Sequence, residues 1–208
     1  GWGGLFADAV ISSGFNADPT FTALTGGGAD LFLTGRVNVP YQVNVSGPPG
    51  LELGEVLGDE LGTSLADYTG LLDTIKGAAP NVLARDLSTI MTRGFATNRG
   101  FAEALASVPV PAASFSATYL GTQLGAVARA MAARDVLGVR RQLFLVGVGG
   151  FDTHSEQAIT LPKLLLNLDQ SLIAFRAVLA ELGLEDSVAL FTASDFGRTL
   201  AVNGDGTD

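Results

Sequence analysis

The sequence predicts an α/β fold, with a parallel or mostly parallel sheet flanked by helices. Two uncharged apolar runs, residues 142–148 and 187–193, have the length and composition of buried strands. Between them lies a segment with a helical apolar period, long enough for about six turns. The order strand, helix, strand is the parallel crossover unit, which is right-handed in nearly all proteins.

The composition is that of one packed, acidic chain. With 208 residues there is enough chain for one sizeable core, and we treat residues 1–208 as a single α/β domain. Hydrophobic residues make up 47% and charged residues 16%, which argues against disorder. The net charge of −9 without a basic run argues against nucleic acid as a partner. No uncharged stretch suits a membrane span, because the longest contains two prolines.

Residues 1–58 are expected to be irregular, with short strands, and residues 59–137 helical. A short helix fits residues 1–14, which end at a glycine, and proline and glycine then punctuate the chain as far as residue 58. Helices are predicted over 61–75 and over 80–107. The second should be broken, because each of its glycines, Gly94 and Gly100, costs a helix interior about 1 kcal/mol.

A third helix is predicted after Ser114, which is a suitable N-cap residue. Its apolar positions recur at helical spacing and should face a core: Leu120, Leu124, Val127 and Met131.

Residues 138–208 contain the β-α-β unit. Gly149 and Gly150 end the first strand and allow a sharp turn. The helix that follows should have Pro162 in its first turn and end at Gly183. Its apolar stripe consists of Leu165, Leu168, Leu172, Phe175, Leu179 and Leu182. Both strands of such a unit end at one edge of the sheet, so the loops after them should meet.

Polar residues follow each predicted strand. Asp152 and the only histidine, His154, follow the first, and Asp195 and Arg198 follow the second. Carboxylates and imidazole bind divalent ions, so we predict a metal site at Asp152, His154 and Asp195. Arg198 either clamps an anion or pairs with Asp195. The alternative is structural: Asp152 caps a loop, His154 is a surface side chain, and Asp195 pairs with Arg198.

Two other enzyme classes are disfavoured. A Ser-His-Asp hydrolase needs a histidine base, but the single histidine is assigned to the metal, and the Gly-x-Ser-x-Gly motif is absent. A dinucleotide fingerprint needs glycine at position 152, which is aspartate, and a helix directly after the glycines.

Three segments together resemble the bacterial family catalogued as domain of unknown function 1501. They are Gly149-Gly-Phe-Asp-Thr-His-Ser-Glu-Gln157, Ser194-Asp-Phe-Gly-Arg-Thr199 and Asn203-Gly-Asp-Gly-Thr-Asp208. That family is similar in fold to the alkaline phosphatase and sulfatase superfamily, and many members resemble exported proteins. The resemblance therefore implies an alkaline-phosphatase-like fold, a periplasmic or exported location, and a metal-dependent hydrolase of phosphate or sulfate esters.

The resemblance also implies roles for particular residues. Asp152, His154 and Asp195 match metal-ligand positions, and Asp208 begins the segment that reads Asp-His-Gly in the family. The ion would be Zn, Mn, Mg or Ca, and the substrate a small anionic ester held by Arg198.

The chain also departs from the family. It stops before the histidine of Asp-His-Gly and starts after the strand that carries the superfamily nucleophile, and Phe196 stands where phosphatases tend to have histidine. We therefore expect a domain that is incomplete at both ends and lacks its nucleophile. The alternative function is a non-catalytic binding or structural domain with a salt-bridged loop cluster and no metal.

Overall fold

The computed structural model describes residues 1–27, 31–43 and 81–208. The chain forms two compact units, one made of residues 1–45 and 107–208 and the other of residues 46–106. That both belong to one domain stays a prediction, and the helix predicted over 61–75 lies outside the described residues. Within the described ranges, no helix has the length and apolar character needed to cross a bilayer.

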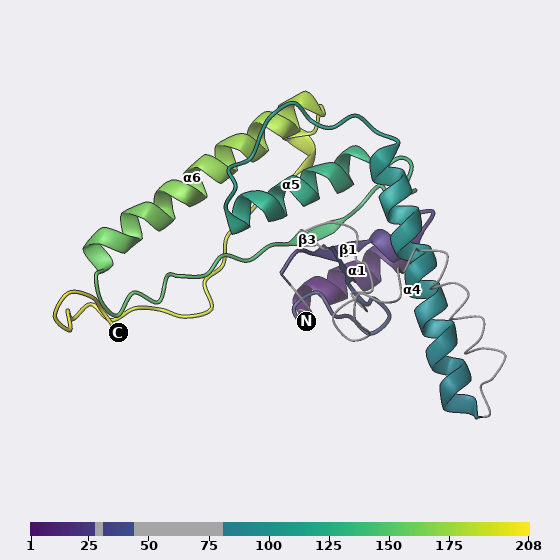
Figure 1. The fold of residues 1–208 in the computed structure, drawn as a ribbon, viewed down its shortest axis with the longest axis horizontal. Helices are drawn as coiled ribbons and strands as arrows, with labels where there is room; N and C mark the ends of the chain where they lie inside the picture. Colours follow the sequence, from purple (N-terminus) through teal and green to yellow (C-terminus); the bar gives the residue numbers. More distant parts are fainter. Residues whose placement is uncertain (28–30, 44–80) are drawn as a thin grey trace, which may run out of the picture. The chain divides into compact units, whose positions relative to one another are not determined.

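A small parallel sheet lies at the centre of the first unit (Figure 1). β1 (Ala23–Thr25) is the middle strand, and β2 (Tyr41–Gln42) and β3 (Leu143–Leu145) both run parallel to it. Leu24 of β1 lies opposite Phe144 of β3. The prediction of a mixed α/β fold with a parallel sheet is confirmed.

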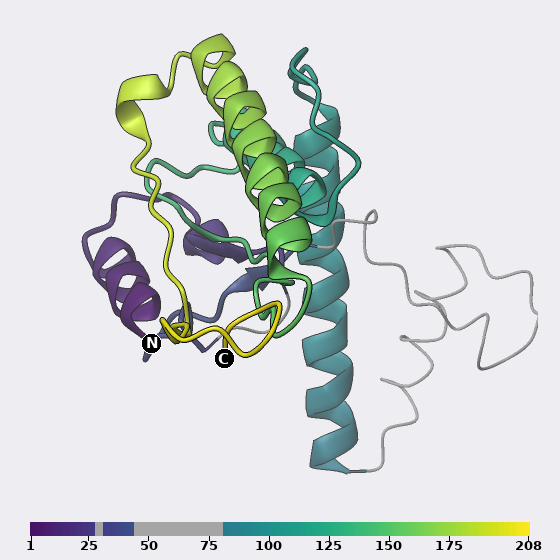
Figure 2. The ribbon, with the colours of Figure 1, turned by 90° about the vertical axis from the view of Figure 1, so that its left-hand side faces the viewer.

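Helices cover both faces of this sheet (Figures 1 and 2). On one face, Phe144 and Val146 pack against the apolar core between α5 (Tyr119–Ala132) and α6 (Gln157–Glu181). On the other, Leu143 and Leu145 pack against Ala7, Ala23 and Leu33, and Ala7 belongs to α1 (Trp2–Ser12). Because side chains alternate along a strand, one uncharged run supplies both faces.

The helix predicted over residues 1–14 forms as α1, and Gly14 follows it with a φ of +69°. Its buried face is made of small residues, Gly3, Gly4 and Ala7. A Cβ on Gly4 would lie 2.1 Å from the backbone carbon of Thr34, so the glycine permits a close backbone approach.

The first turns of α5 and α6 differ from the prediction. Thr118, and not Ser114, caps α5, its Oγ1 accepting a hydrogen bond from the backbone N–H of Gly121 at 3.1 Å. α6 begins at Gln157, which places Pro162 beyond the first turn. The reason is tertiary, because the N–H of Gln157 donates to the carbonyl of Asp205 at 3.0 Å. The predicted end is confirmed, since the glycine at 183 has a φ of +66°.

The apolar stripes of α5 and α6 form one shared core. All four predicted positions of α5 are buried, as are Phe175 and Leu179 of α6. Leu168 and Leu182 pack partly against them, whereas Leu165 near the start of α6 is 50% exposed.

The second strand, predicted over residues 187–193, is not formed. After η2 (Glu185–Ser187) the chain has no strand partner within the described part of the molecule, and Phe191 is 79% exposed. Only Val188 packs partly against the α5–α6 core. An apolar run predicts a strand, but a strand also needs hydrogen bonds from a neighbour, and β3 at the sheet edge is only 3 residues long.

The second unit contributes one described helix, α4 (Val82–Ala106). The break predicted at Gly94 and Gly100 is wrong, because α4 is continuous. Glycine keeps both backbone hydrogen-bonding groups, so its cost of about 1 kcal/mol weakens a helix without interrupting it. In α4 two glycines, each with this cost, are tolerated within a helix of 25 residues.

The carboxylate of Asp8 ties a loop of the first unit to α1. It accepts hydrogen bonds from the backbone N–H groups of Arg36, Val37 and Asn38, at 2.6, 3.1 and 2.8 Å. The bond from Asn38, followed by that from Arg36, lowers the pKa of Asp8 below its ordinary value of 3.8.

We expect the first unit to lose stability in acid through Asp8. A lowered pKa in the folded state means that the stabilising contribution is present above the unfolded-state value and is lost as pH falls through the folded value. Urea unfolding followed by circular dichroism between about pH 5 and pH 2 measures this loss. In Asp8→Asn, the free energy of unfolding should fall less steeply with decreasing pH than in the wild type. In Asp169→Asn, on an exposed position of α6, it should fall as in the wild type. The same pH dependence of the unfolding free energy in the wild type and in Asp8→Asn would contradict the stabilising role of the Asp8 carboxylate.

Candidate functional site

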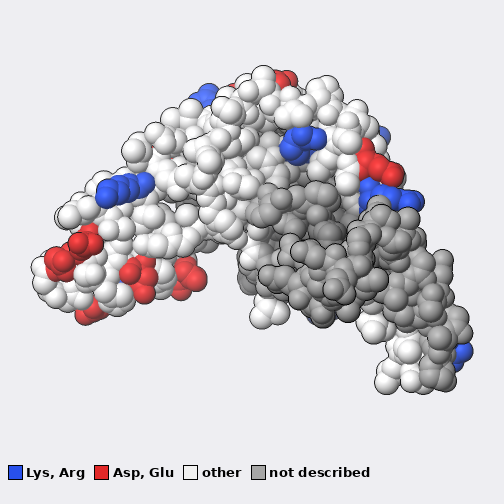
Figure 3. All heavy atoms as spheres, viewed as in Figure 1, with Lys and Arg blue, Asp and Glu red and all other residues white. Residues whose placement is uncertain are grey.

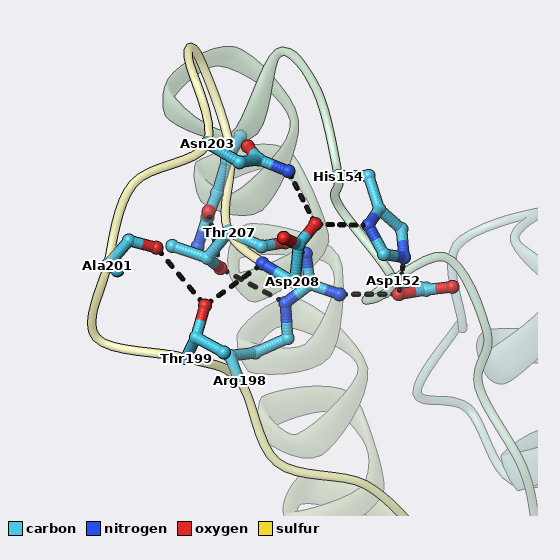
Figure 4. A network of polar contacts seen from close by, with 9 residues as sticks. Asp152, His154, Arg198, Thr199, Ala201, Asn203, Thr207 and Asp208 are labelled. Carbon is cyan, nitrogen blue, oxygen red and sulfur yellow. Dashed lines mark hydrogen bonds and ion pairs between the residues drawn. The ribbon is translucent and has the colours of Figure 1, made fainter.

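Two loops of the first unit meet beside the start of α6 (Figures 1 and 4). One follows β3 and carries Asp152 and His154, and the other is the C-terminal loop with Arg198 and Asp208. These four side chains form a contiguous network of ion pairs and hydrogen bonds, which we call the polar cluster.

The loop after β3 is held in place by α5. Gln123 is fully buried, and its Oε1 accepts from the backbone N–H of Gly147 at 3.0 Å while its Nε2 donates to the carbonyl of Gly147 at 2.7 Å. This amide completes the backbone bonding where β3 ends. The strand predicted to end at Gly149 and Gly150 ends earlier, at Leu145, and the two glycines lie in the extended loop after it, without the sharp turn that was predicted. Gly150 has a φ of +92°, a conformation that favours glycine.

The C-terminal loop folds back on itself and docks on the first loop. Val202 and Thr207 form an antiparallel bridge, and the Thr207 hydroxyl donates to Oε1 of Gln157 at 3.0 Å. Gly206 is buried, and a Cβ there would lie 2.3 Å from the carbonyl oxygen of His154. Glycine at this position therefore lets the two loops come into backbone contact.

His154 lies between two carboxylates (Figure 4). Its Nε2 is 2.9 Å from Oδ1 of Asp152, and its Nδ1 is 3.1 Å from Oδ1 of Asp208. Carboxylates only accept hydrogen bonds, and a neutral imidazole has a single N–H. Both contacts are satisfied only when a second proton or another cation supplies positive charge. The hydrogen bond to His154, followed by that from Asn203, lowers the pKa of Asp208.

Arg198 joins the cluster from the other side of Asp152. One terminal nitrogen donates to Oδ1 of Asp152, the other to the carbonyl of Thr207, and Nε donates to the Thr207 hydroxyl at 3.1 Å. The expected alternative partner was Asp195, and that pairing is wrong in the described structure. The predicted position of Asp195 depended on a strand over 187–193, and this segment is not a strand. Asp195 is exposed and takes no part in the polar cluster.

The structure thus brings together Asp152, His154, Arg198 and Asp208 and leaves Asp195 apart. Sequence reasoning missed three supporting polar side chains: Gln157, Asn203 and Thr207. The turn-forming composition of residues 203–208 is the signal that marked this loop, but it does not identify its contacts. Within the described ranges, no three or more His, Asp or Glu side chains are arranged as a metal-binding group, so the ligand set stays a prediction.

The surroundings of the cluster are acidic. Acidic side chains gather at this end of the first unit, at the left of Figure 3. The side chains of Asp152, His154 and Asp208 are 64, 57 and 62% exposed, whereas that of Arg198 is 20% exposed. The accessible part of the cluster therefore consists of carboxylate oxygens and the imidazole.

A protein-family model described as "Protein of unknown function (DUF1501)" matches residues 83–208, which include both loops of the cluster. Searches of curated proteins and of solved structures found no match.

Proposed function

The chain belongs to this family of proteins of unknown function, and we propose that it is a metal-dependent, hydrolase-like domain that binds or acts on a small anionic ester. In this proposal it resembles phosphatases and sulfatases in fold and is exported. Asp152 and His154 are the central ligands, and Asp208 and Asp195 are the further carboxylates of the same loops. No nucleophile is assigned.

The observation that carries the proposal is the position of Asp152 beside His154. Nε2 and Oδ1 are 2.9 Å apart, which suits neighbouring donor atoms around an ion with ligand bonds of about 2.0–2.2 Å. The second ring nitrogen contacts a carboxylate, an arrangement common to metal-binding histidines. This spacing supports the proposal that Asp152 and His154 hold a divalent ion.

Charge and exposure favour a ligand site over a stabilising cluster. Two carboxylates face one guanidinium, so the cluster is negative when His154 is neutral and attracts a cation. Exposed ion pairs add about 0–1 kcal/mol each to stability, so these contacts do little for the fold by themselves.

A bound divalent ion supplies Lewis-acid polarisation of a phosphate or sulfate oxygen. Asp152 and His154 would hold the ion, and Arg198, which contacts the same oxygen of Asp152 as His154 does, would supply a guanidinium nitrogen for the anionic ester.

One observation favours the second candidate, a non-catalytic binding or structural domain. All three guanidinium nitrogens of Arg198 are already bonded to Asp152 and Thr207. Such a domain needs no ion, and its thermal stability should be indifferent to a chelator.

Calorimetric titration of chelator-treated protein with Mn²⁺ and Zn²⁺ tests the proposal. We expect the wild type to bind, and Asp152→Ala and His154→Ala to lose more than about 10-fold in affinity, because each removes a ligand. Asp205→Asn is the matched control, since it removes one acidic charge from an exposed position of the C-terminal loop. Unchanged metal affinity in folded Asp152→Ala or His154→Ala would refute the site.

A further inference from the structure

We infer that Asp208 is a positioning carboxylate, which accepts the Nδ1 proton of His154 and leaves the Nε2 lone pair facing Asp152. The inference rests on the proposed metal site. It gives Asp208 a role through the imidazole ring in place of direct coordination.

The two carboxylates beside the ring differ in their other partners. Oδ1 of Asp152 already accepts a charged donor, the guanidinium of Arg198. Among the described residues, the donor to Oδ1 of Asp208 besides the ring is neutral, Nδ2 of Asn203 at 2.5 Å. The carboxylate that is less neutralised is the stronger acceptor, so the single N–H of a neutral imidazole is directed to Asp208.

Asp208 is also held by its backbone. Its N–H donates to the hydroxyl of Thr199 at 3.1 Å, and its main-chain oxygen accepts from the N–H of Thr199 at 2.6 Å. Two residues earlier, Gly206 is packed on the carbonyl of His154. These contacts keep the carboxylate at the ring, as the orientation of a metal-binding histidine requires.

The consequence lies on the other side of the ring. With the proton on Nδ1, the Nε2 lone pair and Oδ1 of Asp152 are two acceptors 2.9 Å apart. A cation between them relieves their repulsion. Asp208 thereby selects which nitrogen binds the ion.

The single histidine makes the tautomer directly measurable. Long-range ¹H–¹⁵N correlation spectra of metal-free protein at about pH 8 report which nitrogen carries the proton. We expect the Nδ1–H form in the wild type, in Asp208→Asn, which keeps an acceptor oxygen, and in the control Asp205→Ala. Asp208→Ala should move the proton toward Nε2.

Metal titration of the same variants completes the test. Asp208→Ala should bind Mn²⁺ or Zn²⁺ about 10- to 100-fold more weakly, and Asp208→Asn should lose less. Equal losses of metal affinity in Asp208→Ala and Asp208→Asn would identify Asp208 as a charged ligand and overturn the inference. Three results from the spectra would also overturn it: a wild-type proton on Nε2, a doubly protonated ring, or an unchanged tautomer in Asp208→Ala. An Nδ1–H tautomer that depends on Asp208, in a protein that binds no metal, would refute the proposed function and leave the positioning role standing.

Discussion

Replacing Gly206 with alanine should separate the two halves of the polar cluster while leaving all of its charged side chains in the sequence. The new Cβ would lie 2.3 Å from the carbonyl oxygen and 2.4 Å from the carbonyl carbon of His154, and neither backbone atom can move away freely. The C-terminal loop must shift, and Asp208 then leaves the ring. We expect metal affinity to fall about 10- to 100-fold, as for other losses of support to a ligand.

Gly197→Ala is the matched control for this variant. It makes the same substitution in the same loop, where no atom lies within 4 Å of the added Cβ. Both proteins should keep wild-type thermal unfolding, because the α5–α6 core contains neither position. A Gly206→Ala protein with wild-type metal affinity would show that the loop contact does not build the site.

Asn16→Asp should destabilise the first unit by about 2–4 kcal/mol, because a buried donor is replaced by an acceptor. Asn16 is 9% exposed, and its Oδ1 accepts from the N–H groups of Arg140 and Arg141 at 2.8 and 3.0 Å. Its Nδ2 donates to the carbonyl of Arg141 at 2.8 Å and to the Thr22 hydroxyl at 3.0 Å. Aspartate keeps the first two bonds but directs an oxygen at the carbonyl of Arg141.

Urea unfolding followed by circular dichroism measures the difference. Asn81→Asp is the control, since it makes the same change at an exposed position whose side-chain oxygen accepts from the N–H of Ala84 at 2.9 Å, a bond that aspartate keeps. The urea concentration at the midpoint of unfolding should fall for Asn16→Asp, while the slope of the unfolding free energy against urea concentration stays unchanged. This combination indicates a loss of stability without a change in the surface area exposed on unfolding. A loss below about 0.5 kcal/mol, the range of ordinary surface substitutions, would show that Asn16 does not anchor the start of β3.

Part of the site was predictable because it is local. Asp152 and His154 follow an apolar run and two glycines, and their chemistry follows from their residue types. The predicted position of Arg198 depended on a second strand over 187–193, which is not formed. Arg198 still contacts Asp152, because the C-terminal loop docks on the backbone of His154. Asp195, placed by the same argument, takes no part in the polar cluster.

The sequence by itself determined the helical stripe of α5, the buried part of the α6 stripe, the glycine that ends α6, and the acid and imidazole groups of the candidate site. These features depend on spacing within a few residues, which a linear pattern records. The tertiary structure alone decided the residue at which α6 begins, the absent second strand, and the pairing of His154 with Asp208, which lie 54 positions apart. Such contacts depend on which backbone groups remain free after the chain has packed, and local spacing carries no record of that.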